Sequence, residues 1–316
     1  MNAITNTKEL YAAFDGLSME GGWHRRTPAL WPAPRENFLP NRWKYADVKP
    51  ILDAAGALIS TEFAERRNLT MTNPAEGNIY PTLRTMVSAY QMIRPGEVAD
   101  AHRHTANALR MILEGRGTYT VVGGTRVEMR PGDVLLTPNW AWHSHENVGG
   151  EDCYWLDFLD VPLVHLMEPM FFEHHPDGVE KNPQDATESP IAFRWEETVE
   201  RLAKASDDAN GMAGRQIELT VNGGAALDTM RLFMQSLKAG QKTRKMRTTA
   251  NSIFAVAQGS GTTTVGDTDI SWKFGDVIAL PAWRAYTHQA DTDAVLLRVT
   301  DMPVFEKLNW LREEIV

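Results

Sequence analysis

Two pairs of histidines constrain this sequence more than any other feature. His102 and His104 form the first pair, and His143 and His145 form the second. Residues two apart on a β-strand share a face, so the members of each pair point the same way. Imidazole is the commonest protein ligand for a transition metal. Two histidines from one strand and one from another therefore predict a metal site that is open on one side.

The sequence between the two pairs indicates short antiparallel strands. Residues 118–122, Thr-Tyr-Thr-Val-Val, lie between a glycine-rich turn and the hairpin dipeptide Gly123-Gly124. Residues 134–136, Val-Leu-Leu, follow a Pro-Gly-Asp turn and have the composition of a buried strand. Short strands with glycine-rich turns at this spacing favour a small antiparallel barrel or jelly roll.

The motifs resemble those of a known fold family. Gly-x5-His-x-His, starting at Gly96, and Gly-x5-Pro-x-Trp-x2-His-x3-Asn, starting at Gly132, resemble the two motifs of a cupin barrel. The usual cupin adds a glutamate ligand soon after the second histidine, whereas residues 105–110 contain no carboxylate. Three histidines followed by Arg110 resemble the gentisate 1,2-dioxygenase family, which includes salicylate and 1-hydroxy-2-naphthoate dioxygenases. Residues 102–110 and 137–145 carry this similarity.

The resemblance implies an all-β fold, a bicupin of two jelly-roll (double-stranded β-helix) barrels with N-terminal and connecting helices. It also implies an Fe(II)-dependent ring-cleaving dioxygenase in which His102, His104 and His143 hold the iron. The substrate would be a 2-hydroxy aromatic carboxylate, opened by O2 between the carbons that bear the carboxylate and the hydroxyl. From the ligand chemistry alone, zinc, manganese and nickel stay open.

Three further residues have family counterparts in the active site. Arg110 is expected to anchor the substrate carboxylate through its planar fork, and its alternative is an internal ion pair, for instance with Asp157. Asp157 matches an active-site acid that supports the arginine or histidine network. His145 matches a histidine that can accept the phenolic proton, and the alternative for it is a hydrogen bond across the barrel rim.

Upstream residues are expected to shape the substrate pocket. Gln91 matches a glutamine that lines the pocket of family members. A substrate-contacting arginine is assigned to Arg67, with Arg66 as the second choice and a solvated helix end as the alternative for both. Val87 stands where many members have an aromatic ring. This replacement favours a larger or differently substituted ring over gentisate itself.

The second half of the chain repeats the first. Residues 259–264 correspond to 115–120, and residues 275–283 correspond to 132–140. A repeat at this long period indicates duplicated domains. The expected division is a helical and extended arm over 1–82, a metal-binding barrel over 83–161, a connector over 162–224, a second barrel over 225–303 and a C-terminal helix over 304–316.

The ligand positions are not preserved in the second half. Met246 and Thr248 stand opposite the first histidine pair, and Tyr286 stands opposite His143. Only His288 is retained, opposite His145. These side chains cannot provide a nitrogen-rich iron site, so the second barrel is predicted to hold no metal.

Composition narrows the function classes. A formal net charge of −9 argues against nucleic-acid binding, and no apolar run reaches the length of a membrane span. The single cysteine, Cys153, and an N-terminus without a signal-peptide pattern indicate a cytoplasmic protein. The family resemblance adds a homo-oligomer, a tetramer. The alternatives are gentisate 1,2-dioxygenase proper and a non-catalytic cupin that binds a small aromatic acid; a metal-dependent isomerase would lack its usual glutamate.

Overall fold

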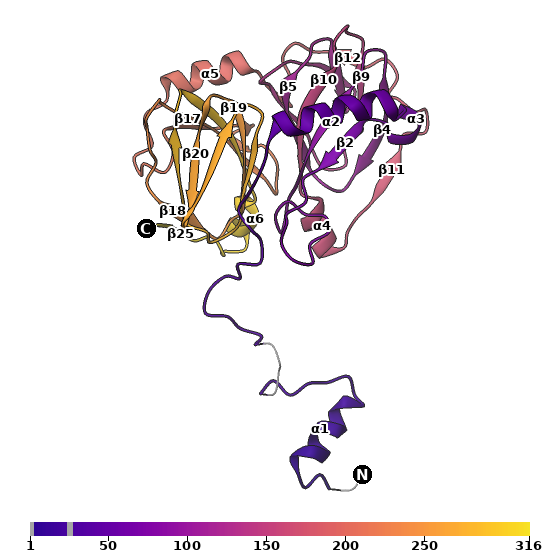
Figure 1. The fold of residues 1–316 in the computed structure, drawn as a ribbon. Helices are drawn as coiled ribbons and strands as arrows, with labels where there is room; N and C mark the ends of the chain where they lie inside the picture. The colour runs from indigo at the N-terminus through magenta and orange to yellow at the C-terminus, as the bar shows by residue number, and fades with distance from the viewer. Residues whose placement is uncertain (1–2, 24–27) are drawn as a thin grey trace. The chain divides into compact units, whose positions relative to one another are not determined.

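The computed structural model describes residues 3–23 and 28–316, which form two compact units, one ending at Arg35 and the other spanning Glu36–Val316 (Figure 1). The first unit contains helix α1 (Thr7–Asp15). Its N-terminus is capped by Asn6, whose side-chain oxygen accepts a hydrogen bond from the Glu9 amide at 3.0 Å. This Asn-x-x-Glu pattern has the form of a capping box at the start of a helix.

The second unit contains two β-barrels (Figure 1). In the first barrel, two six-stranded sheets enclose a core that includes Ile112, Val127 and Trp155. One sheet has the order β13 (Ala192–Phe193), β8 (Val134–Thr137), β5 (Ala108–Glu114), β10 (Cys153–Leu159), β3 (Val87–Ile93), β2 (Arg67–Thr70). The other has the order β11 (Phe172–His174), β4 (Val98–His104), β9 (His143–Asn147), β6 (Thr118–Val122), β7 (Thr125–Met129), β12 (Gln184–Asp185).

The second barrel repeats this arrangement around a core that includes Phe254, Trp272 and Leu296. Its larger sheet has the order β1 (Asn41–Trp43), β22 (Val277–Leu280), β19 (Ser252–Gln258), β24 (Ala294–Thr300), β17 (Arg231–Leu237), β14 (Arg215–Glu218). Its smaller sheet has the order β21 (Thr268–Lys273), β20 (Ser260–Val265), β23 (Tyr286–Ala290), β18 (Met246–Thr248), β25 (Glu313–Ile315). A separate hairpin joins β15 (Thr220–Val221) to β16 (Gly224–Ala225).

Each barrel receives its edge strand from the segment that precedes the other barrel. Strand β1 pairs with β22 of the second barrel, and α2 (Tyr45–Leu58) then leads back to β2 of the first. Strand β13 pairs with β8 of the first barrel, and α5 (Trp195–Lys204) leads on to β14 of the second. The expected divisions at residues 82 and 224 do not anticipate this exchange, which ties the two barrels together.

Helices α2 and α5, which follow the two exchanged edge strands, begin in the same way. The Trp195 amide donates to Asp133 Oδ1 at 2.8 Å, and the Tyr45 amide donates to Asp276 Oδ1 at 3.0 Å. Each aromatic ring lies against a glycine of the barrel it caps. A Cβ on Gly132, whose φ is +86°, would lie 2.6 Å from the Trp195 ring. The Gly-Asp dipeptide of each motif therefore both makes a turn and anchors a helix.

The helix α2 ends at Leu58 and is followed by α3 (Thr61–Ala64) and β2. The C-terminal helix expected over 304–316 needs correction. It is the short α6 (Met302–Lys307), which ends before Asn309, a residue with a φ of +57°. Strand β25 follows and pairs with β18. The connector also contains α4 (Val161–Met167). Among the described residues, every helix is too short or too polar to span a lipid bilayer.

Candidate metal centre and active site

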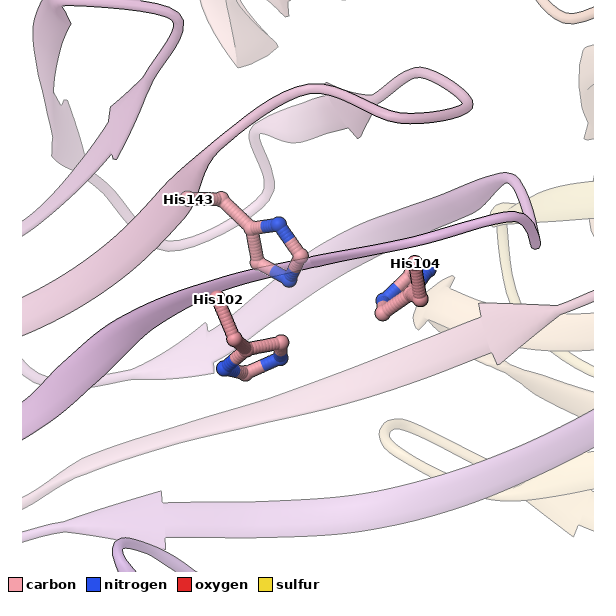
Figure 2. A group of neighbouring side chains, drawn as sticks. All are labelled: His102, His104 and His143. Atoms are coloured by element: carbon pink, nitrogen blue, oxygen red, sulfur yellow. The ribbon is translucent and has the colours of Figure 1, made fainter. Parts of the chain in front are cut away.

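Three imidazoles from two neighbouring strands converge inside the first barrel (Figure 2). His102 and His104 lie on β4, and His143 lies on β9 as the direct register partner of His102. The centroid of the His143 ring lies 4.4 Å from that of His102 and 4.9 Å from that of His104. One nitrogen from each ring lies within 4.8 Å of the others. The structure therefore brings together the three residues that the spacing singled out.

Backbone carbonyls orient all three rings. The Nδ1 atoms of His102, His104 and His143 lie 3.3, 2.8 and 3.0 Å from the carbonyl oxygens of Asp100, Ala106 and Ala141, respectively. A carbonyl only accepts, so each Nδ1 carries the hydrogen and each Nε2 keeps a free lone pair. This is the arrangement in which neutral histidines bind a metal.

The surroundings favour the neutral form of these rings. Burial, then the nearby Arg66 cation, lowers the pKa of His102 to about 3. Burial also lowers the pKa of His104, and it lowers that of His143 to well below its usual value. Unprotonated nitrogens are available to a metal at neutral pH. The donor set is three neutral imidazoles with no carboxylate, which fits a divalent transition metal and leaves its charge uncompensated until an anion binds.

The second barrel has different side chains at the strand positions that hold the histidines in the first barrel. Met246 on β18 pairs with Tyr286 on β23, as His102 pairs with His143 in the first barrel. The amide of Trp283 donates to the Thr248 carbonyl at 2.6 Å, as the amide of Trp140 does to the His104 carbonyl at 2.9 Å. The only three-residue metal-ligating group found among the described residues is that of the first barrel.

Arg110 is buried and hydrogen-bonded inside the first barrel. Its Nε lies 3.3 Å from Asp157 Oδ1, and its two terminal nitrogens donate to the hydroxyls of Thr120 and Thr137 at 2.9 and 3.0 Å. Nη1 also approaches His145 Nδ1 at 3.5 Å. One of its five N–H groups remains for another partner. The ion pair with Asp157, the alternative weighed for Arg110, is therefore present.

Asp157 connects the arginine to the rest of the site. Its carboxylate also accepts hydrogen bonds from Gln91 Nε2 at 2.5 Å and Trp155 Nε1 at 3.0 Å. Gln91 in turn accepts at Oε1 from Arg66 Nε, also at 2.5 Å. The network of hydrogen bonds thus runs from the barrel interior to Arg66. The Arg66 side chain is partly exposed, with 17% of its surface accessible.

Arg67 does not face this network, which corrects the preference for Arg67 over Arg66. Its guanidinium is buried, donates to the carbonyls of Gly56 and Ile59 at 3.0 and 2.7 Å, and pairs with Glu97. The reason lies one residue upstream. Glu65 has φ +50° and ψ −59°, and the Arg66 amide bonds to the Ala64 carbonyl in a γ-turn.

His145 is the fourth histidine of the motif and is fully buried. Burial, then the Arg110 charge, lowers its pKa to well below the usual value. Its Nε2 has no hydrogen-bond partner among the described residues. A buried nitrogen that has no hydrogen-bond partner and lies beside the three clustered histidines is available to a ligand bound in the site.

Val87 shares a face of β3 with Gln91. Both residues oppose β10, where Val87 pairs with Leu159 and Ala89 pairs with Asp157. Val87 is 2% exposed and is not a member of the hydrophobic clusters found in the described chain. Its side chain therefore belongs to the face that carries Gln91 and Asp157.

Strand β11 lies beside the histidine cluster and was not foreseen. Phe172 pairs with His104 and His174 pairs with His102, so both side chains lie on the face of the metal cluster. The Phe172 ring centroid is 5.3 Å from that of His102. Half of the Phe172 surface is exposed. Phe-Glu-His was the available signal, but a three-residue edge strand is too short for periodicity to reveal.

Arg103 points away from the cluster, as its parity on β4 predicts. It forms an ion pair with Glu173 at 2.6 Å, and its guanidinium lies 4.5 and 4.4 Å from the ring centroids of Trp140 and Trp142. The two tryptophans therefore pack on the outside of β4 rather than in the site.

The comparisons with known proteins agree with this geometry. The cupin domain model matches residues 89–159, which span β3 to β10. Gentisate 1,2-dioxygenase 1 of Aquipseudomonas alcaligenes is 31% identical over 97% of this chain and 95% of its own length. The chain belongs to the gentisate 1,2-dioxygenase family of cupins. A second relative, 5-aminosalicylate 1,2-dioxygenase of a Comamonas species, is 34% identical over 98% of this chain and 90% of its own.

A solved structure extends the family likeness to the fold. Salicylate 1,2-dioxygenase from Pseudoaminobacter salicylatoxidans, in a structure of its adducts with gentisate, matches with a TM-score of 0.91 and 27% identity. The match covers all of this chain and 96% of the other. The expected bicupin fold is confirmed. As a member of this family, the protein whose sequence is described is a ring-cleaving dioxygenase.

Proposed function

We propose that this dioxygenase uses Fe(II), held by His102, His104 and His143, to open a 2-hydroxy aromatic carboxylate. The observation that carries the proposal is the set of three free Nε2 lone pairs, each oriented by a backbone carbonyl, with no carboxylate ligand. Bound iron would supply a site that holds the substrate and O2 together. The ring would break between the carbons that bear the carboxylate and the hydroxyl.

The chain's own residues then bind and orient the substrate. We assign the substrate carboxylate to Arg66, because its guanidinium is partly exposed and its charge reaches His102, His104 and His145. Arg110, which the family resemblance makes the anchor of the substrate carboxylate, is instead proposed to act as a buried cation that favours an anionic substrate, because its side chain is held by Asp157 and lies near His145. A bidentate grip by Arg110 would require it to give up an internal partner.

His145 is assigned the phenolic oxygen of the substrate. Its Nε2 is unpartnered, and its depressed pKa keeps it neutral before the substrate binds. An anionic substrate nearby opposes the charge of Arg110 and favours protonation of the ring. His145 can then accept the phenolic proton at Nε2 in the tautomer with its hydrogen on Nδ1, which requires Nδ1 to give up the contact from Arg110 Nη1, because an arginine only donates. Gln91 holds Arg66 and Asp157 in register.

Substrate size is the next element of the proposal. Val87 and Ala89 present small side chains on the strand that carries Gln91. We propose that the enzyme accepts salicylates with bulky substituents, or 1-hydroxy-2-naphthoate, in preference to gentisate. Gentisate 1,2-dioxygenase activity proper is the alternative.

Oxygen consumption by the Fe(II)-loaded protein tests the proposal directly. Substituted salicylates, gentisate and 1-hydroxy-2-naphthoate would be compared, with benzoate as a control that lacks the hydroxyl. Metal analysis should give about one iron per chain, because the second barrel has Met246, Thr248 and Tyr286 in place of ligands. Binding of an aromatic acid without O2 uptake, for every compound tried, would favour a non-catalytic cupin.

Subunit composition and compartment remain predictions. A homotetramer is proposed from the family resemblance, and a cytoplasmic location from the single cysteine. Light scattering of the purified protein would measure the number of chains in the assembly.

A further inference from the structure

The loop that follows His104 determines how the ring of this histidine is oriented. Residues 105–107 connect β4 to β5, and the carbonyl oxygen of Ala106 lies 2.8 Å from His104 Nδ1. This contact holds the ring and leaves Nε2 free for a metal. The placement of the loop therefore sets the placement of the ligand atom, so the residues that fix the loop also fix the ligand.

Asn107 ends this loop, and each of its polar groups is engaged. Its backbone amide donates to Asp160 Oδ1 at 2.8 Å, and its backbone carbonyl accepts from the Asp160 amide at 3.3 Å. Its side-chain Oδ1 accepts from the Asn139 amide at 2.8 Å. Its Nδ2 donates to Asp160 Oδ2 at 3.2 Å and to Thr229 Oγ1 at 3.0 Å. Because Asn107 is buried, a partner that is removed leaves one of these groups unsatisfied.

Thr229 reaches this loop from the other barrel. It lies just before β17, the strand that begins at Arg231, and its hydroxyl donates to Asp160 Oδ2. The same hydroxyl accepts from Asn107, so Thr229, Asp160 and Asn107 form a closed cycle of hydrogen bonds. The members of a buried polar network depend on one another, because each bond orients the groups that make the next.

The second barrel contains the same cycle, completed by a residue of the first. Asn251 donates to Asp301 from its amide at 2.7 Å and from Nδ2 at 2.8 Å, and the Thr85 hydroxyl donates to Asp301 Oδ2. Asn251 Nδ2 also lies 3.3 Å from Thr85 Oγ1. Three residues before Asn251 stands Thr248, where the first barrel has His104. The second cycle therefore joins the two barrels without supporting a metal ligand.

We propose that Thr229 is a positioning residue for the metal centre, because it holds the loop that orients His104 through Asn107. The inference rests on the metal site proposed above and gives the barrel without ligands a part in the chemistry of the other. Without the Thr229 hydroxyl, Asn107 and Asp160 lose a shared partner and the loop relaxes. The Ala106 carbonyl then holds His104 less firmly, and Fe(II) binds more weakly. The alternative is a cycle that serves only to join the barrels.

Fe(II) affinity, measured under nitrogen by competition with a chelator of known affinity, tests this inference. Thr229→Val keeps the shape of the side chain and removes its hydroxyl. The Kd of this variant for Fe(II) should rise about tenfold, at the lower end of the range for residues that orient metal ligands. Thr229→Ser keeps the hydroxyl and should restore the affinity of the unaltered chain. An unchanged Kd in Thr229→Val would overturn the proposal.

Thr85→Val is the matched control, since it removes the corresponding hydroxyl from the other cycle. Both valine variants should lower Tm to a similar extent, whereas only Thr229→Val should weaken Fe(II) binding. The visible spectrum of the Co(II)-substituted protein reports the geometry of the ligands and should change in Thr229→Val alone. An equal loss of Fe(II) affinity in the two variants would assign the effect to barrel contact in general and would contradict the role given to Thr229.

Thr229 is half-buried, and Thr229→Ala takes the place of Thr229→Val in these measurements if the valine variant does not fold. The result for the unaltered chain separates this inference from the proposed function. An unaltered chain that binds no Fe(II) would contradict the proposed metal site itself. Fe(II) bound with one affinity by the unaltered chain and by the Thr229 variants would leave that site intact and contradict only the positioning role.

Discussion

The Nε of Arg110 lies 3.3 Å from Oδ1 of Asp157, and neither side chain is more than 4% exposed. The pair sits on adjacent strands in direct register, so the sheet itself fixes its geometry. Arg110 also donates to two threonine hydroxyls. A cation held this firmly shapes the electrostatics of the site more readily than it moves to meet a ligand. Arg66, at the exposed end of the same network, has the greater freedom to bind one.

Substitution of Arg110 should therefore mainly lower stability, whereas substitution of Arg66 should mainly weaken substrate binding. Arg110→Ala leaves the Asp157 carboxylate buried without its cation, which typically costs about 3–5 kcal/mol of folding free energy. Arg66→Ala should change stability little and raise KM, and Arg66→Lys should recover part of the loss because it keeps the charge but not the fork. Urea unfolding and steady-state kinetics on both residues provide the measurement. Unaltered stability in Arg110→Ala would contradict the structural role assigned here.

His104→Ala should abolish both iron retention and turnover, since it removes one of three ligands. The barrel should still fold because His104 supports no core packing. His174→Ala is the matched control, since His174 is an exposed imidazole on the neighbouring strand β11 and lies outside the ligand set. Iron content by elemental analysis and far-UV circular dichroism would be measured together. Full iron content in His104→Ala would show that the ligand set is wrong.

The sequence predicted which three histidines come together because strand parity and turn spacing determine which side chains share a face. It could not rank Arg66 above Arg67. That choice depends on the γ-turn at Glu65, where a single positive φ decides which of two successive arginines reaches Gln91. No sequence signal marks a glutamate for that conformation.

The short edge strands were the other feature that could not be predicted from the sequence. β11 and β25 occupy equivalent edges of the two barrels, and each has three residues. Their pairing is set by the neighbouring strand rather than by their own propensity. The C-terminal helix predicted over 304–316 shows the consequence, because the chain turns at Asn309 and residues 313–315 form a strand instead.

Val87→Trp should reduce the activity on bulky substrates first. Val87 is on the face that carries Gln91, so an indole would extend toward the substrate at a steric cost of roughly 1–3 kcal/mol. The ratio of kcat/KM for 1-hydroxy-2-naphthoate to that for gentisate is the readout, with Val87→Leu as a milder change at the same position. If the ratio did not move, Val87 would be excluded from the pocket wall.

His145 can be tested for proton acceptance against hydrogen-bond donation. His145→Gln supplies a neutral amide that can donate but cannot take a proton, whereas His145→Ala supplies neither. Removal of a general base typically costs about 10²–10⁴-fold in rate. If His145 accepts the phenolic proton, kcat should fall by a similar factor in both variants while iron content is unchanged. A nearly normal kcat in His145→Gln would identify His145 as a donor to the substrate instead.

His288 should make the stability of the chain depend on pH. Burial, followed by the Arg298 charge, lowers its pKa to about 3 in the folded state, compared with about 6.5 for a histidine in the unfolded chain. Between these values the unfolded chain binds a proton that the folded chain does not. The contribution of His288 to the free energy of unfolding is thus complete above pH 6.5. It falls toward pH 3, by at most about 1.4 kcal/mol per pH unit.

His288→Gln removes this titration and keeps an N–H donor in the barrel. The free energy of unfolding of the variant should therefore gain on that of the unaltered protein as the pH falls from 7 to 4.5. The histidines of the first barrel titrate in both proteins, so their effect cancels in the difference. Urea unfolding at a series of pH values, at one constant ionic strength and without halide, gives that difference directly. If the difference stayed constant over this range, His288 would have to titrate normally in the folded chain, and its burial in the second barrel would be wrong.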